Sequence, residues 1–139
     1  MKQVQLFTKN QIPEVAFLLA DKLKKSSIMT FTGPLGAGKT TLIQSILQQL
    51  GVIGPIISPT YTYVCVYDLP NGKKVYHFDL YRFTSLDEFI EAGFDEYLNQ
   101  EGNYCLIEWP GVIQELLQDE VVAIKLDHSS ENIRKIEVV

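Results

Sequence analysis

The chain has 139 residues, of which 46% are hydrophobic and 21% charged, the balance of a globular domain with a core of its own. A net charge of −5 and a pI near 5.0 weigh against nucleic-acid binding by this chain alone, because such binding rests on several lysines and arginines. No apolar run approaches the roughly 20 residues that cross a bilayer, and the N-terminus lacks the pattern of a secretory signal, so we expect a cytoplasmic protein with no membrane partner.

The first part of the chain predicts a strand, a helix and a second strand. Residues 4–7 are a strand candidate, and residues 27–32 resemble a buried strand. Between them, Asn10 is expected to cap a helix over residues 11–25, with Pro13 tolerated in its first turn. The apolar stripe of this helix is expected to consist of Val15, Leu18, Leu19 and Leu23.

A glycine-rich segment, Gly33-Pro34-Leu35-Gly36-Ala37-Gly38-Lys39-Thr40, follows the second strand, and a helix then runs to about Leu50 and stops at Gly51. The segment matches G-x-x-x-x-G-K-[ST] in full, which happens by chance in a chain of this length roughly half a percent of the time. In such a loop, backbone N–H groups and the helix N-terminus surround a phosphate. We expect Lys39 to reach the β- and γ-phosphates of a nucleotide and Thr40 to ligate Mg²⁺.

Residues 61–67 and 75–81 are rich in strand formers and flank Asn71-Gly72, the strongest short-range signal for a hairpin. A two-residue turn at this dipeptide would fix the register of the two strands. The pairs that this register brings together are Val64 with Asp79 and Thr62 with Tyr81.

Polar residues share one face of the second hairpin strand. A period of two places His77, Asp79 and Tyr81 together, and the predicted register brings the loop Ser58-Pro59-Thr60 just beyond Asp79. An apolar strand face that carries His and Asp suggests a site. The alternative is a strand whose His and Asp face solvent.

In the second half of the chain, Ser85 is expected to cap a helix over residues 86–92, with Glu88 at the capping-box position. The next strand, residues 103–109, contains Glu108. An acidic residue at the carboxyl end of a buried strand beside a phosphate loop lies where it can reach Mg²⁺; the alternative is an ordinary exposed strand end. The remaining predicted strands are residues 121–126 and 133–138.

These elements predict one α/β domain over residues 1–139, a P-loop NTPase-like three-layer sandwich. Its central sheet is expected to be mostly parallel, with an added antiparallel hairpin. Cys65 and Cys105 lie in apolar, strand-like stretches and are predicted to be buried free thiols, since nothing indicates an oxidising compartment.

Four motifs then occur in the order found in one known family: Gly36-Ala37-Gly38-Lys39-Thr40-Thr41, Ser58-Pro59-Thr60-Tyr61, His77-Phe78-Asp79-Leu80-Tyr81-Arg82 and Glu108-Trp109-Pro110. Over nearly its whole length the chain resembles the TsaE (YjeE) family, the ATPase subunit of bacterial tRNA threonylcarbamoyladenosine synthesis. The resemblance implies binding of Mg²⁺ and ATP and hydrolysis of ATP. Because the chain has only Arg82 and Arg134 and no clear arginine finger of its own, we expect hydrolysis by the chain alone to be slow. The resemblance also implies TsaD and TsaB as partners, which modify the adenosine next to the anticodon. This chain would contact tRNA only through the complex with these partners, and its ATP hydrolysis would reset that complex.

The resemblance implies roles for individual residues as well. Glu108 and Asp79 become the acidic, catalytic groups near metal and water, and Thr40 and Glu108 become the metal ligands. The loop Ser58-Pro59-Thr60 becomes a switch-like loop. The nucleotide-binding residues expected in the phosphate loop and at the start of its helix are Gly33, Gly36, Ala37, Gly38, Lys39, Thr40 and Thr41.

Three further residues lie outside the phosphate loop and the acidic pair. Thr8 and Arg134 are candidates for the base and ribose side of the nucleotide, with ordinary surface positions as the alternative. Trp109 is expected to pack beside the site rather than to take part in the reaction.

Three other functions fit the sequence less well. A small-molecule kinase usually clamps its substrates with several arginines, and this chain has only Arg82 and Arg134. A GTPase needs a guanine-specific N/T-K-x-D motif, and Thr8-Lys9-Asn10-Gln11 lacks the aspartate. A nucleotide-binding scaffold without turnover is disfavoured by Glu108 and Asp79, and only a rate measurement separates it from an ATPase.

Overall fold

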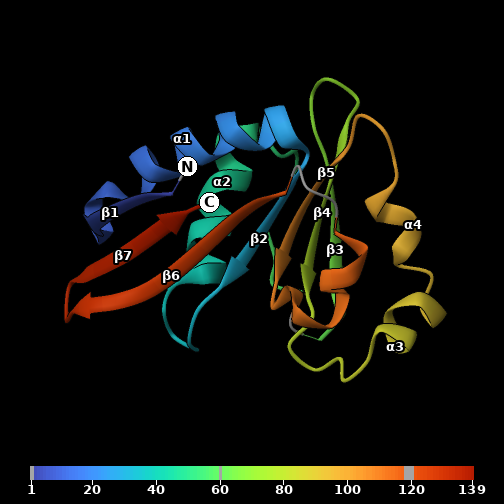
Figure 1. Cartoon of the computed structure of the whole chain (residues 1–139). Helices are drawn as coiled ribbons and strands as arrows, with labels where there is room; N and C mark the ends of the chain where they lie inside the picture. Colours follow the sequence, from blue (N-terminus) through green and yellow to red (C-terminus); the bar gives the residue numbers. More distant parts are fainter. Residues whose placement is uncertain (1, 60, 118–120) are drawn as a thin grey trace.

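The computed structural model of this chain describes residues 2–59, 61–117 and 121–139 (Figure 1). Within these ranges no helix is long and apolar enough to cross a membrane. The strands are β1 (Gln3–Thr8), β2 (Ile28–Thr32), β3 (Val64–Asp68), β4 (Lys74–Asp79), β5 (Tyr104–Glu108), β6 (Val122–Ser130) and β7 (Ile133–Val138). The helices are η1 (Lys9–Gln11), α1 (Ile12–Ser26), α2 (Lys39–Leu50), α3 (Leu86–Glu91), α4 (Asp95–Leu98) and η2 (Pro110–Leu116).

All these strands join one sheet in the order β1-β7-β6-β2-β5-β4-β3. The four strands β4, β5, β2 and β6 are parallel, while β3 pairs with β4, and β7 with β6 and β1, in the antiparallel sense. Because β2 lies between the parallel strands β5 and β6, the loop that follows it opens at their shared carboxyl edge. The predicted α/β fold with an antiparallel hairpin is therefore confirmed. The sheet is mixed: its four central strands are parallel, and antiparallel strands flank them on both sides, β3 at one edge and β7 with β1 at the other.

Helices cover both faces of the sheet, which gives three layers (Figure 1). On one face, α1 and α2 enclose a core with residues of β2, β5, β6 and β7, including Met29, Leu106 and Ile136. On the other, α3, α4 and η2 pack over Phe78 and Ile107. These helices supply apolar side chains to a dense cluster of aromatic rings that includes Phe89 and Phe94.

The hairpin is present, but its predicted register is wrong. Val64 pairs with Phe78 rather than with Asp79, and Cys65 pairs with His77. The connection is the five-residue segment 69–73, closed by a hydrogen bond from the Leu69 N–H to the Lys73 carbonyl. A shift of one residue turns every side chain to the opposite face, so Cys65, not Val64, lies on the face of Asp79.

The predicted pairing of Thr62 with Tyr81 is wrong for the same reason and for a second one. β3 begins only at Val64, because Tyr63 has a left-handed φ of 66° and closes a turn by donating its N–H to the Pro59 carbonyl at 2.8 Å. β4 ends at Asp79, whose carboxylate accepts the Tyr81 N–H. Neither residue of the expected pair therefore belongs to a strand.

Two expectations for the first helix are also wrong. Asn10 does not cap it; the chain first makes the short helix η1, which Thr8 and Gln11 close with a hydrogen bond of 2.8 Å from the Thr8 N–H to the Gln11 side chain. Leu18 is 56% exposed, because the buried face of α1 consists of Val15, Ala16, Leu19, Ala20 and Leu23.

Other local expectations are confirmed. Pro13 lies in the first turn of α1, α2 ends at Leu50 with Gly51 in a left-handed conformation, and Ser85 caps α3 by accepting the Glu88 N–H. Cys65 and Cys105 are both free and buried, and burial raises the pKa of Cys105 to about 12.

Candidate functional site

The glycine-rich loop between β2 and α2 has a backbone that only glycine adopts without strain. Gly33 has a φ of 142°, and a Cβ there would collide with the carbonyl oxygen of Leu126. Gly38, with a φ of 95°, is the N-cap of α2 and brings no side chain to the helix end. No side chain of the N-cap residue therefore occupies the first N–H groups of α2, and these groups can donate to a bound anion.

Lys39, the first residue of α2, folds back onto its own loop. Its ammonium group donates to the carbonyl oxygens of Gly33 at 2.6 Å and Pro34 at 2.9 Å, and it lies 4.3 Å from the centre of the Trp109 ring. The residue is only 5% exposed. Burial lowers the pKa of Lys39, while the charges of Glu108 and Asp79 oppose that shift.

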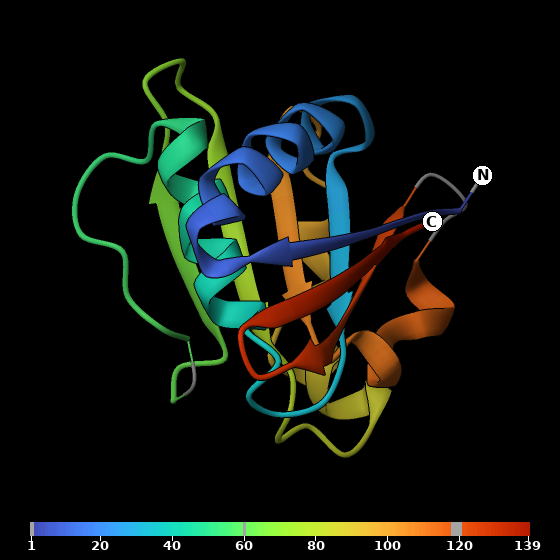
Figure 2. The ribbon, with the colours of Figure 1, turned by 90° about the vertical axis from the view of Figure 1, so that its left-hand side faces the viewer.

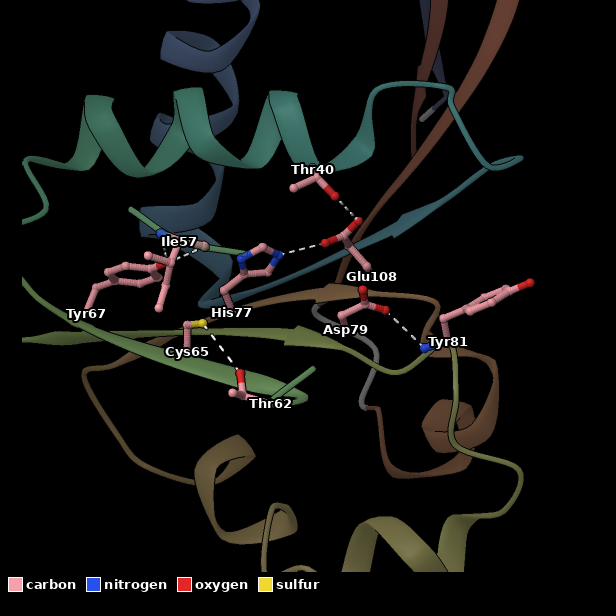
Figure 3. A network of polar contacts seen from close by, with 9 residues as sticks. All are labelled: Thr40, Ile57, Thr62, Cys65, Tyr67, His77, Asp79, Tyr81 and Glu108. Carbon is pink, nitrogen blue, oxygen red and sulfur yellow. Dashed lines mark hydrogen bonds and ion pairs between the residues drawn. The ribbon is translucent and has the colours of Figure 1, made fainter. Parts of the chain in front are cut away.

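Glu108 ends β5 and is 3% exposed, so it is not the ordinary exposed strand end that the sequence left open. Both of its carboxylate oxygens have partners (Figure 3). The Thr40 hydroxyl donates to Oε1 at 2.9 Å, and His77 Nε2 lies 2.8 Å from Oε2. The predicted pair Thr40 and Glu108 thus lies in direct contact across 68 residues of sequence.

Asp79 lies beside Glu108, because β4 and β5 run parallel with these two residues in register. Its carboxylate accepts the Tyr81 N–H at 3.1 Å (Figure 3). Burial raises the pKa of Asp79 and the neighbouring charge of Glu108 adds to the rise, whereas the Tyr81 N–H opposes it. The two acidic residues singled out in the sequence therefore form one cluster next to Thr40.

A cavity of about 620 Å³ opens on the other side of the phosphate loop. Its volume is in the range of small-molecule sites. Thr8 and Arg134, the two weakest candidates, both line it, although Lys39, Asp79 and Glu108 are not among its described lining residues. The lining residues are Phe7, Thr8, Lys9, Asn10, Ile12, Gly36, Ala37, Gly38, Thr41, Leu42, Glu131, Asn132 and Arg134.

The loop before β3 contains the residues that the sequence predicts to be switch-like. Ser58 is exposed and Pro59 is buried, while Thr60 lies outside the described residues. The loop is tied to the hairpin just before them: the Tyr67 hydroxyl donates to the Ile57 carbonyl at 2.8 Å and accepts the Ile57 N–H at 3.1 Å. Trp109 follows β5 with a left-handed φ of 57° and contacts Tyr81 and Lys39.

The donor groups fit Mg²⁺ when a nucleotide is present. Within the described residues no cluster of three or more His, Cys, Asp or Glu could hold a metal alone. Thr40 and Glu108 offer a hydroxyl and a carboxylate side by side, and Mg²⁺ usually takes one or two carboxylates and completes its shell with phosphate oxygens and water. The arrangement suits a metal that arrives with a phosphate ligand.

Sequence reasoning missed two sets of residues. Strand alternation places His77 on the face of Asp79 but gives it no role, because its contact with Glu108 depends on how β4 and β5 are aligned. Phe7, Lys9 and the segment 131–132, which line the cavity, could not be predicted from the sequence, because no motif marks them. The pairing of β1 with β7 is what brings them beside the phosphate loop.

Comparison with known proteins adds to this geometry. The family model described as "Threonylcarbamoyl adenosine biosynthesis protein TsaE" matches residues 6–136. The chain belongs to the TsaE family. The resemblance in the four sequence motifs is thereby confirmed.

Individual members of the family support the assignment. A TsaE protein of Rickettsia felis is 38% identical over 135 residues, which cover 96% of this chain and 77% of that protein. A TsaE protein of Bacillus subtilis is 36% identical over 138 residues, covering 98% of this chain and 85% of the relative. The crystal structure of Bacillus subtilis YdiB has the same fold, with a TM-score of 0.68 and 28% identity, over 99% of this chain and 84% of that one.

Proposed function

We propose that this chain is a Mg²⁺-dependent subunit that binds and hydrolyses ATP. It acts with TsaD and TsaB in threonylcarbamoyl modification of the tRNA adenosine next to the anticodon. Hydrolysis resets the complex. The observation that carries the proposal is the contact between Thr40 and Glu108 at the mouth of a complete phosphate loop. Membership of the TsaE family supports the pathway.

In this proposal the phosphate loop binds the β- and γ-phosphates through its N–H groups and Lys39. Bound Mg²⁺ neutralises charge on the phosphates. Glu108 and Thr40 would hold the metal, and Asp79 would position the attacking water or support a metal ligand. Thr8 and Arg134 contact the sugar and base from the cavity that adjoins Gly36 and Gly38.

Partner dependence follows from the positions of the two arginines. Phosphoryl transfer often relies on an arginine that stabilises the transition state, worth about 10³–10⁵ in rate. Arg82 lies over the rings of Tyr61 and Tyr63, and its charge acts on Asp79; Arg134 lines the cavity beside the loop. We infer that Arg82 or a group of TsaD or TsaB completes the site when the partners bind, or that the partners order the switch-like loop. We also infer that these partners hold the tRNA, since this chain is acidic.

A steady-state ATPase assay tests the proposal. The chain alone should turn over well below the roughly 10 s⁻¹ typical of enzymes, and its cognate TsaD–TsaB pair should raise the rate. Glu108→Gln, assayed with the same partners, is the negative control. A fast isolated enzyme, or one indifferent to TsaD–TsaB, contradicts partner dependence. Tight Mg²⁺–ATP binding with no turnover in any mixture would favour a scaffold.

A further inference from the structure

His77 contacts Glu108, a proposed metal ligand, at the carboxylate oxygen that Thr40 does not contact. It lies in β4 with 0% exposure, surrounded on its face of the sheet by the apolar residues Val75 and Leu106. Its Nε2 atom is 2.8 Å from Glu108 Oε2 (Figure 3). Polar side chains in such surroundings are disfavoured unless a specific hydrogen bond offsets the loss of water.

The direction of this hydrogen bond follows from the chemistry of the two groups. A carboxylate oxygen has no proton to donate, so Nε2 carries the hydrogen and Oε2 accepts it. The other ring nitrogen, Nδ1, is buried and has no hydrogen-bond partner among the described residues. The ring therefore meets Glu108 with one nitrogen and leaves the second unsatisfied, which indicates that the contact with Glu108 is what retains a histidine here.

Glu108 needs such a contact to keep its orientation. Thr40 fixes only Oε1, and the carboxylate of Asp79 lies beside Glu108 in the adjacent strand and repels it. With Oε2 held by His77, both oxygens are fixed and the carboxylate can turn neither toward solvent nor away from Asp79. Groups that hold a metal ligand in this way typically contribute about 10- to 100-fold to metal affinity.

We propose that His77 is a positioning residue: it donates its Nε2–H to Glu108 and thereby fixes the orientation of the carboxylate that binds Mg²⁺. The proposal rests on the proposed function, because it assigns His77 a task at the same metal site. It adds a residue that touches neither nucleotide nor metal.

Three variants of His77 separate positioning from packing. In His77→Gln the amide nitrogen lies near the place of Nε2, in His77→Asn it lies near the place of Nδ1, and His77→Leu has no donor. Calorimetry should measure ATP binding as a function of Mg²⁺ and, separately, without Mg²⁺. We expect the Leu and Asn variants to need about 10- to 100-fold more Mg²⁺, with ATP binding in its absence unchanged, and the Gln variant to stay near wild type.

Cys65→Ala is the matched control, because Cys65 is buried, pairs with His77 across the hairpin, and makes no described contact with Glu108. It should leave the Mg²⁺ requirement unchanged. A His77→Leu protein with wild-type Mg²⁺ dependence overturns the inference. So does equal impairment of the Gln and Asn variants in folded proteins. A wild-type chain that binds no Mg²⁺–ATP would instead contradict the proposed function.

A second measurement needs neither nucleotide nor metal. The chain has two histidines, His77 and His128, so ¹⁵N spectra of the ring nitrogens in a His128→Gln background report on His77 alone. A proton on Nε2 supports the inference. A bare Nε2 with the proton on Nδ1 overturns it, whatever the chain does with ATP.

Discussion

Lys39 is held by its own phosphate loop. Its ammonium donates to two loop carbonyls and lies against Trp109, and the residue is almost fully buried. A phosphate bound in the loop would compete with these carbonyls for the same charge. Ligand entry should therefore turn the Lys39 side chain and change the surroundings of Trp109, which is the only tryptophan in the sequence.

Lys39→Met tests this competition, because Met keeps the length of the side chain and its contact with the indole ring but has no charge. We expect Mg²⁺–ATP affinity to fall about 10- to 150-fold, the equivalent of the roughly 1.5–3 kcal/mol of a hydrogen bond to a charged group. Calorimetry and Trp109 fluorescence should both record the loss.

The matched control for Lys39→Met is Lys73→Met. Lys73 also lies over an aromatic ring, that of Tyr104, and bonds its hydroxyl, but it lies in the hairpin connection. ATP affinity should not change in this variant. Equal losses in the two variants, or none in Lys39→Met, would contradict the role given to Lys39.

Asp79 gives a prediction about pH. Its pKa is raised first by burial and then by Glu108, while the Tyr81 N–H, His77 and Arg82 oppose the rise. A carboxyl with a raised pKa stabilises the fold at a pH below its unfolded value, and this stabilisation is lost as the pH rises through the folded value. Asp79→Asn keeps an acceptor for Tyr81, so it should melt above wild type at neutral pH and lose that advantage in acid. Thermal melts of both proteins across pH, without ligand, measure the difference; a variant less stable at neutral pH contradicts it.

At the scale of elements, the hairpin β3–β4 both contributes Asp79 and anchors the loop that contains Ser58 and Pro59. The anchor is the Tyr67 hydroxyl, which bonds both backbone groups of Ile57. The loop is therefore held to strand β3 at Ile57, immediately before Ser58 and Pro59. The switch-like behaviour proposed for the loop therefore has a fixed hinge at Ile57.

Tyr67→Phe removes this anchor and leaves the ring in place. We expect a loss of about 1 kcal/mol in the free energy of unfolding and faster hydrogen exchange of the Ile57 amide, which loses its described acceptor. Native-state hydrogen exchange checks both. Tyr104→Phe, which removes a hydroxyl bonded to Lys73, is the control and should not affect Ile57. An unchanged Ile57 amide would show that the hydroxyl does not hold the loop.

The sequence could predict much of what depends on a continuous segment, although the cap expected at Asn10 is wrong. The phosphate loop, the caps at Ser85 and Gly51, and the strand that ends in Glu108 are all of this kind. It could not predict the hairpin register, since the dipeptide Asn71-Gly72 fits several loop lengths and the core decides among them. The contact of His77 with Glu108 was likewise out of reach, because it depends on how β4 and β5 are aligned.

At the scale of the whole molecule, the cavity beside the phosphate loop joins distant parts of the chain. Its walls come from Phe7 and Thr8 at the end of β1, from the start of α2, and from the turn between β6 and β7. Figure 2 shows β1, β6 and β7 crossing the same side of the molecule, with both termini at the opposite end of the β1–β7 pair from that turn.

Nucleotide binding should therefore protect two segments that lie far apart in sequence. We expect slower hydrogen exchange at residues 8–12 and 131–134 with Mg²⁺–ATP, and a stabilisation of about 2.7 kcal/mol at a ligand concentration 100 times Kd. Exchange followed by mass spectrometry measures the protection. Arg134→Ala should lower it in both segments, whereas Arg82→Ala should not, because Arg82 is not among the described lining residues of the cavity. Protection confined to the phosphate loop would contradict a nucleotide in this cavity.

The separation of these segments along the chain also bears on how the protein folds. Thr40 meets Glu108 across 68 residues, and Gly38 lines the same cavity as Arg134, which lies more than half the chain length further on. Contacts between residues so far apart in the sequence form late, after the loop-closure entropy of the intervening chain has been overcome. A nascent chain with β2 and α2 already made would have its complete P-loop motif and still lack the acidic cluster and the far wall of the cavity. Nucleotide would then bind only after the sheet has formed, and it would stabilise the protein mainly by slowing unfolding.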